Sequence, residues 1–187
     1  PMNKRLNINK LSYKQKKSLS QALIATSTAS AVVVGAVPIS FADALILTPL
    51  EVGMIKGISK IYGIQKSEQS MGFVNTIVEI GTVSLAAKST ISALKSIPGL
   101  HIATSIMNAV IAGCFVFAIG EASDYAFSEI SKGNKTLADI DWLKKMVESK
   151  LTQGILKNAE QIMHKISESG IDDLKTIALM ILEIFKS

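Results

Sequence analysis

Residues 96–120 read SIPGLHIATSIMNAVIAGCFVFAIG, a stretch without Asp, Glu, Lys or Arg in which only His101 can ionise. A second uncharged stretch covers residues 18–42. Each is long enough to cross a bilayer, which takes about 20 apolar residues. Both contain many Ser, Thr, Ala and Gly residues, however, and this dilution also suits the core of a soluble bundle. A helix that is apolar on all sides lies either at the centre of a protein or in lipid, and the sequence leaves both interpretations open.

The composition indicates a single domain with an aliphatic core. Of the 187 residues, 48% are hydrophobic but only 5% are aromatic, so the core must be built mainly from small and aliphatic side chains. The single cysteine, Cys114, lies within the apolar stretch 96–120. One cysteine excludes a disulfide within the chain and a thiolate metal cluster.

The positive charge is concentrated near the N-terminus. The formal net charge is +5, and six basic residues precede the first acidic one: Lys4, Arg5, Lys10, Lys14, Lys16 and Lys17. We expect residues 1–17 to form a basic tail that is attracted to an anionic membrane surface, although a solubilising extension explains the same charges equally well. A nucleic-acid-binding domain requires a basic face across the fold, so we predict no nucleic-acid partner.

Basic residues followed by an apolar run and by Ala42-Asp43-Ala44 also imitate a secretory signal peptide. Three features disfavour that interpretation: the basic region is long, the apolar run contains several Ser and Thr residues, and Pro38 interrupts it. We therefore expect a cytoplasmic protein that is peripheral to, or embedded in, the inner membrane of the cell.

Turn and cap residues predict helices in the first half of the chain. A helix over residues 12–37 ends at Pro38, which cannot continue it, and Asp43 lies in the connection that follows. Thr48-Pro49-Leu50-Glu51 then combines an N-cap hydroxyl, a proline at the first helical position and a glutamate at the third. Gly63 is suited to end this second helix in the left-handed conformation.

Two further helices are predicted over residues 67–97 and 102–130, with the turn Pro98-Gly99 between them. Small residues at spacings of four favour close contacts between helices. One such ridge is Ser27, Ala31 and Gly35, and another is the pair Gly53 and Gly57.

The last part of the chain has a different pattern. Apolar residues recur at helical spacing over residues 139–168, and again after Gly170, where Asp172 can cap a final helix. The sequence therefore predicts an all-α protein: a compact bundle of long apolar helices over residues 18–132, followed by an amphipathic helical pair over residues 133–187.

No catalytic motif is present. The chain lacks the G-x-x-x-x-G-K-[ST] loop that cradles phosphates and the G-x-S-x-G of hydrolases. The two histidines have no neighbouring ligands at metal-binding spacing, so we predict no metal, no cofactor and no enzymatic activity. For the acids in apolar surroundings, Asp43, Glu79 and Asp124, we expect structural pairing with a lysine or a helix start rather than proton transfer.

Four motifs occur in an order that resembles a known family. They are GAVPISFAD at residues 35–43, LTPLEVGMI at 47–55, KIYG at 60–63 and IPG at 97–99. Together they resemble the domain of unknown function 697, over about Lys16 to Lys132. That helical domain is found at the C-terminus of some bacterial Era-like GTPases and in stand-alone membrane-associated proteins. Glu51 stands where the family usually has Gln.

The resemblance implies a link to a GTPase, but this chain contains no GTPase motif, so any such protein would be a separate partner. Our functional hypothesis is a non-enzymatic, membrane-associating interaction domain that acts with that GTPase. The alternative is a pore-forming or membrane-permeabilising protein that inserts its apolar helices. Either hypothesis is compatible with a homo-oligomer.

Overall fold

The computed structural model describes residues 7–37, 47–83 and 92–186, with the side chains of residues 47–48, 82–83, 154–157 and 185–186 also left out of the description. A short 3₁₀ helix, η1 (Ile8–Lys10), precedes the α-helices. These are α1 (Tyr13–Gly35), α2 (Leu47–Ile61), α3 (Glu68–Val83), α5 (Thr104–Ser131), α6 (Ile140–Ser169) and α7 (Leu174–Lys186). The described residues contain no strand, which confirms the all-α prediction.

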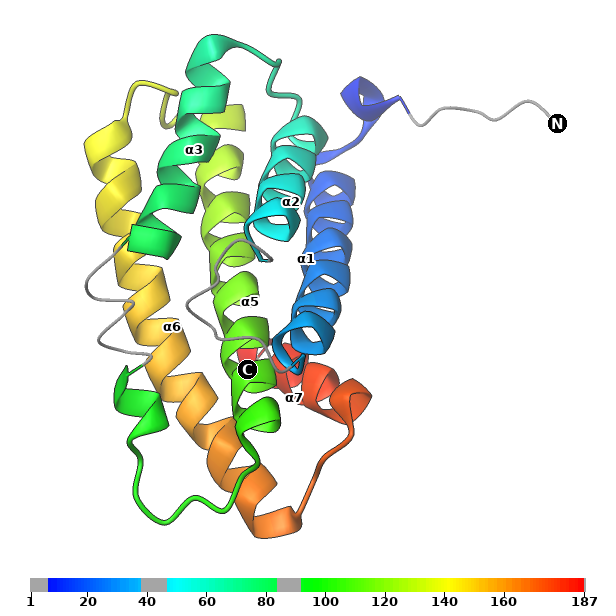
Figure 1. Cartoon of the computed structure of the whole chain (residues 1–187). Coiled ribbons are helices and arrows are strands. Elements are labelled where there is room, and N and C mark those ends of the chain that lie inside the picture. The colour runs from blue at the N-terminus through cyan, green and yellow to red at the C-terminus, as the bar shows by residue number, and fades with distance from the viewer. Residues whose placement is uncertain (1–6, 38–46, 84–91, 187) are drawn as a thin grey trace, which may run out of the picture.

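Helix α5 is the centre of the bundle. Figure 1 shows it between α1 and α2 on one side and α3 and α6 on the other, with α7 against its lower part. Every residue from Asn108 to Gly120 is buried. The apolar stretch that the sequence left open between a protein core and lipid therefore lies, in this structure, in the chain's own core.

Helices α6 and α7 belong to the same bundle. Helix α6 packs along α3 and α5, and α7 contacts α1, α5 and α6. Their buried residues, including Leu143, Ile162 and Ile181, join the central hydrophobic core. The amphipathic pair predicted from the sequence thus covers α5 with its apolar faces.

The small-residue ridge on α1 brings its backbone close to α5. A Cβ atom added at Gly35 would lie 2.6 Å from Ala112 Cβ and 2.8 Å from the Asn108 carbonyl oxygen, so only glycine fits there. On α2, a Cβ at Gly57 would meet the Leu23 side chain at 2.6 Å, whereas nothing lies within 4 Å of one at Gly53. The predicted Gly53–Gly57 contact pair is therefore wrong at Gly53, which faces away from the neighbouring helices.

One face of α1 is not covered by the bundle. Leu19 and Val33 are 36% and 56% exposed, and Val37, which follows the helix, is 44% exposed. Between them the hydroxyls of Thr26 and Ser30 donate to carbonyl oxygens one turn earlier in the same helix, so this face carries neither charge nor unpaired hydroxyl protons. By length and composition α1 and α5 are both able to cross a membrane, but 72% of the apolar window in α5 is buried, against 33% in α1.

Glycines in the left-handed conformation lie in turns between the helices, including the turns that the sequence predicted at Gly63 and Gly99. Gly63, Gly99, Gly133 and Gly170 all have positive φ, between 65° and 80°. At the end of α2 the Gly63 N–H donates to the Lys60 carbonyl, and the Ile64 N–H to that of Ser59. This pair of hydrogen bonds is a Schellman motif, which satisfies the last carbonyls of the helix.

Two predicted helix starts differ from the structure. Helix α2 begins at Leu47, so Thr48 lies in its first turn and is not the N-cap, while Pro49 still lies where its missing N–H costs no hydrogen bond. Glu51 is then too far along the helix to close a capping box. Before α7, the carboxylate of Asp173, not of Asp172, accepts the Thr176 N–H at 2.9 Å.

The predicted third helix, residues 67–97, is helical in both parts that the structure describes. These parts are α3, Glu68–Val83, and residues 92–95; residues 84–91 lie outside the described residues. At the N-terminus, Ser12 caps α1 in a capping box with Gln15. Lys14, Lys16 and Lys17 are therefore part of α1, and they are held in fixed positions by the helix.

Candidate functional site

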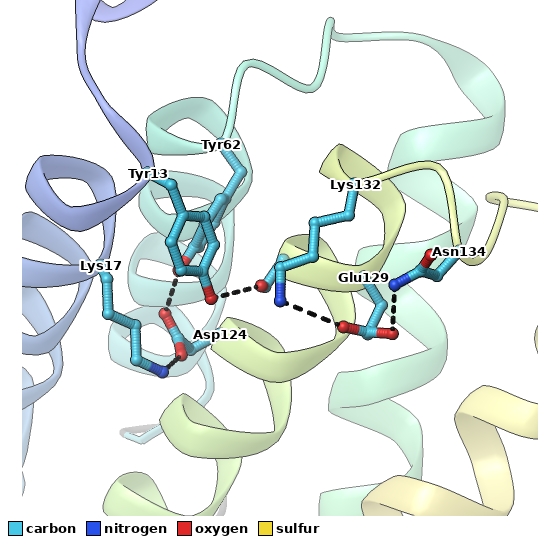
Figure 2. Close-up of polar contacts among 8 residues, drawn as sticks. Tyr13, Lys17, Tyr62, Asp124, Glu129, Lys132 and Asn134 are labelled. Carbon is cyan, nitrogen blue, oxygen red and sulfur yellow. Dashed lines mark hydrogen bonds and ion pairs between the residues drawn. The ribbon is translucent and has the colours of Figure 1, made fainter.

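A buried carboxylate joins three helices at one end of the bundle. Asp124 on α5 is 0% exposed. Its Oδ1 accepts a hydrogen bond of 2.7 Å from the Tyr62 hydroxyl, and its Oδ2 forms an ion pair with Lys17 Nζ. Figure 2 shows Tyr62, which follows α2, and Lys17, on α1, both reaching this carboxylate.

A second set of polar contacts lies beside Asp124 (Figure 2). The Tyr13 hydroxyl is 3.0 Å from Ser128 Oγ, and Lys132 Nζ lies 4.7 Å from the centre of the Tyr13 ring. Lys132 also contacts Glu129, at 3.4 Å. These contacts attach the beginning of α1 to the end of α5.

The charged and polar groups of this network have a structural role. Burial, followed by the hydrogen bond to Asp124, raises the pKa of Tyr62, so its hydroxyl stays protonated and donates. The hydrogen bond with Ser128 is the largest cause that lowers the pKa of Tyr13. No cysteine, histidine or serine here is paired as a nucleophile with a base. The expected structural pairing of Asp124 with a lysine is confirmed, and the partner is Lys17.

A cavity of about 410 Å³ opens at the same end, between the last turns of α2 and the first turns of α3. Three lysines line it: Lys56 and Lys60 on α2 and Lys66 in the connection. Its other lining residues are Ser59, Ile64, Ser70, Met71 and Val74. The lining contains no acidic residue, so the cavity is basic on one side and apolar on the other.

The sequence around the turn builds this cavity. Lys56, Ser59 and Lys60 are spaced three and four apart, which puts them on one face of α2. The Schellman motif at Gly63 then reverses the chain and turns Ile64 inward. Ser67 and Ser70 cap α3 reciprocally, because each backbone N–H donates to the other's hydroxyl oxygen.

The N-terminal lysines Lys10, Lys14 and Lys16 lie at the same end of the bundle as the cavity. Figure 1 shows η1 and the beginning of α1 at the same end of the bundle as the α2–α3 connection. Lys16 Nζ lies 4.0 Å from the position of a Cβ on Gly63. We call Lys10, Lys14, Lys16, Lys56, Lys60 and Lys66 the basic end. Within the described part of the chain, none of these six lysines forms an ion pair.

The structure separates the predicted site residues. Lys17 points to Asp124 and is not part of the basic end. Pro49 is exposed and Glu51 is buried, while Gly63 and Gly99 form the expected left-handed turns. Lys4, Arg5, Pro38 and Asp43 lie outside the described residues. The lysines of the cavity were not predicted as a group, because it is the turn of the α2–α3 connection at Gly63 that brings Lys66 to the same cavity as Lys56 and Lys60.

Glu51 is the most unusual ionisable group in the described residues. It is 2% exposed, and its Oε2 has no hydrogen-bond partner there. Burial raises the pKa of this carboxyl from 4.5 to about 8, so it is mostly protonated at neutral pH. Among the residues that the structure describes, no group of His, Cys, Asp and Glu is arranged to hold a metal ion.

Comparisons with known proteins identify a family but no characterised relative. The sequence model of a family described as "Domain of unknown function (DUF697)" matches residues 4–153. The match is longer than the resemblance read from the motifs, since it includes all six N-terminal basic residues and about the first half of α6. No curated protein and no solved structure matches the chain.

Proposed function

We propose, from the premise that this chain belongs to the DUF697 family, that it is a non-enzymatic module that associates with anionic membranes through its basic end. The observation that carries the proposal is the gathering of six lysines without ion pairs at one end of the bundle. Each lysine near an anionic surface contributes on the order of 1 kcal/mol of binding. Even partial engagement of six lysines is therefore enough for reversible binding.

The proposal places the protein on the cytoplasmic face of a bacterial cell membrane, which is the anionic surface that such a module meets. The apolar helix α5 remains in the protein core, because every residue from Asn108 to Gly120 is already buried by neighbouring helices. Membrane contact is then a surface event, and it depends on salt.

The test is sedimentation with vesicles of phosphatidylglycerol or of phosphatidylcholine, at low and at high salt. We expect binding to the anionic vesicles that falls as salt is raised. The variant Lys10→Gln/Lys14→Gln/Lys16→Gln should bind more weakly than the charge-matched control Lys144→Gln/Lys145→Gln/Lys165→Gln, whose lysines lie on α6. Equal binding to both lipids, insensitive to salt, would refute the electrostatic account.

The family resemblance extends the proposal to a GTPase partner. The uncharged face of α1 that includes Leu19 and Val33 is exposed, and it offers a helical surface for such a partner. A photo-crosslinking residue placed at Val33 should give an adduct with a GTPase in cells, whereas one at Lys144 should not. Adducts at Val33 that contain only lipid would contradict the partner assignment.

The pore-forming function is the second candidate, and the limited burial of α1 favours it. Insertion of the apolar helices would have to open the bundle and expose Cys114, which is fully buried on α5. We expect a charged, water-soluble thiol reagent to leave Cys114 unmodified with and without anionic vesicles, and dye-loaded vesicles to stay intact. Vesicle-dependent labelling together with dye release would favour the pore instead.

A further inference from the structure

We propose that the cavity between α2 and α3 binds the phosphate group of an anionic membrane amphiphile, with its lysines around the phosphate and its apolar wall against the first carbons of the chain. This inference rests on the proposed membrane association and deepens it. The protein would then recognise one lipid headgroup at a defined site, in addition to the general attraction between its lysines and an anionic surface.

The charge of the cavity selects an anion. Lys56, Lys60 and Lys66 approach it from two different segments, and no carboxylate lines it. Glu68, in the first turn of α3, lies outside the lining. Three lysines beside one cavity without a carboxylate in its lining favour an anion, and a phosphate in the cavity can accept charge-assisted hydrogen bonds from their ammonium groups.

The backbone adds to the positive potential. Ser70 belongs to the first turn of α3 and lines the cavity, so the positive end of the helix dipole faces this region. The hydroxyl of Ser70 is already engaged, since it donates to the Ser67 carbonyl at 3.0 Å. The lysines are therefore the groups that contact the phosphate, and the helix end supports them electrostatically.

The apolar side of the cavity indicates an amphiphile rather than a free ion. Ile64, Met71 and Val74 are the apolar residues of its lining; Val74 is buried, whereas Met71 remains 40% exposed. An inorganic phosphate would leave the Met71 side chain in contact with water, whereas the methylene groups of a lipid would cover it.

The size of the cavity fits a headgroup. A volume of about 410 Å³ lies within the range of ligand pockets, about 300–1,000 Å³. It accommodates a glycerophosphate and the start of an acyl chain. The lining contains no aromatic residue on which a base could stack, so a nucleotide gains only the phosphate contacts there.

Calorimetric titration with short-chain, soluble lipids tests the site without a bilayer. We expect dioctanoyl phosphatidic acid to bind saturably with a stoichiometry of one, dioctanoyl phosphatidylcholine not to bind, and inorganic phosphate and GTP to bind at least tenfold more weakly. Lys60→Gln/Lys66→Gln should weaken phosphatidic acid binding at least tenfold. The charge-matched control Lys144→Gln/Lys165→Gln should leave it unchanged.

A second variant probes the apolar wall. Met71→Glu places a carboxylate at the partly exposed mouth of the cavity, where the fold tolerates a polar side chain, and it should abolish phosphatidic acid binding. Thermal melting verifies that each variant is folded. Unchanged phosphatidic acid binding in both the double-lysine variant and Met71→Glu would overturn the inference.

Failure of the site and failure of the proposed function give different results. If vesicle binding depends on charge and salt but neither cavity variant alters phosphatidic acid binding, the site is overturned and membrane association stands. If GTP or inorganic phosphate binds as tightly as phosphatidic acid, the cavity is a site for soluble phosphates and the lipid assignment is overturned. If phosphatidic acid binds in the cavity but vesicles are not bound, the site is supported and the proposed membrane association fails.

Discussion

Lys17 on α1 and Asp124 on α5, separated by 107 residues in the sequence, form an ion pair in which the carboxylate is buried and the ammonium group is partly exposed. The side chain of Asp124 is 1% exposed and that of Lys17 is 43% exposed. The same carboxylate accepts the Tyr62 hydroxyl. One acidic group thus holds the start of α1 and the end of α2 against the central helix.

Replacement of Lys17 by methionine should destabilise the fold by about 2–4 kcal/mol. The variant leaves Asp124 buried without its counter-ion, and an uncompensated buried charge is costly. Urea unfolding at neutral pH measures the free energy. Lys14→Met is the control, because Lys14 is exposed and lies in the same turn of α1. A Lys17 variant as stable as this control would show that the pair contributes nothing.

Replacement of Tyr62 by phenylalanine should cost about 1–3 kcal/mol, because it leaves Asp124 Oδ1 without its donor in a buried site. A double-mutant cycle with Asp124→Ala, which removes the acceptor, isolates the contribution of the hydrogen bond. The two substitutions should be non-additive. Strict additivity would mean that the Tyr62 hydroxyl and the carboxylate do not interact in solution.

Glu51→Gln should remove a pH dependence of stability. Burial raises the pKa of Glu51 in the folded protein from 4.5 to about 8, so the folded state holds a proton that the unfolded state releases. The contribution of the protonated Glu51 carboxyl to the free energy of unfolding is fully present below pH 4.5. It decreases as the pH rises toward 8 and is lost above pH 8. The loss is on the order of 5 kcal/mol.

Urea unfolding of wild type and Glu51→Gln at pH 5, 7 and 9 measures this effect. The variant should be the more stable protein at pH 9 and should differ least at pH 5. Burial also raises the pKa of Glu121, so the difference between the two proteins, rather than the slope of either, reports on Glu51. A constant difference across the three pH values would contradict the assignment.

Gly113→Ala should destabilise the junction of α1, α5 and α7. An added Cβ would lie 2.6 Å from Ile181 Cδ1 and 2.6 Å from Val32 Cγ2, and such overpacking costs about 1–3 kcal/mol. The matched control is Gly72→Ala on α3, where nothing lies within 4 Å. That variant should gain about 0.5–1 kcal/mol from helix propensity. Thermal unfolding of both variants checks the opposite signs.

Local signals accounted for most of the helix ends. Pro98-Gly99 and Gly63 act through backbone conformation that neighbours do not change, and both were predicted correctly. The start of α2 was missed because Thr48-Pro49-Leu50-Glu51 matches a cap pattern two residues inside the actual helix. Glu51 was predicted to belong to this cap, but it is buried against the bundle. No local sequence pattern indicates such burial.

The candidate site was less predictable than the fold. That Asp124 would pair with a lysine followed from its apolar neighbours, but the choice of Lys17 depends on the register of α1 along α5. Lys66 meets Lys56 and Lys60 only because the α2–α3 connection folds back at Gly63. Contacts of this kind depend on how the segments pack in three dimensions. A cluster of charges in the sequence shows only which residues are close along the chain.

The position of α5 at the centre of the bundle has a consequence for synthesis. Helices α1, α2 and α3 emerge from the ribosome before the helix on which they pack. At a synthesis rate of about 5–20 residues per second, roughly 5–20 seconds pass between the addition of the last residue of α1 and the addition of residue 131, the last of α5. During this interval Ile24 and Ala31, which are later buried, face the surroundings of the nascent chain. Translation is therefore the stage at which the first half of this protein is most open to chaperones, to lipid and to aggregation.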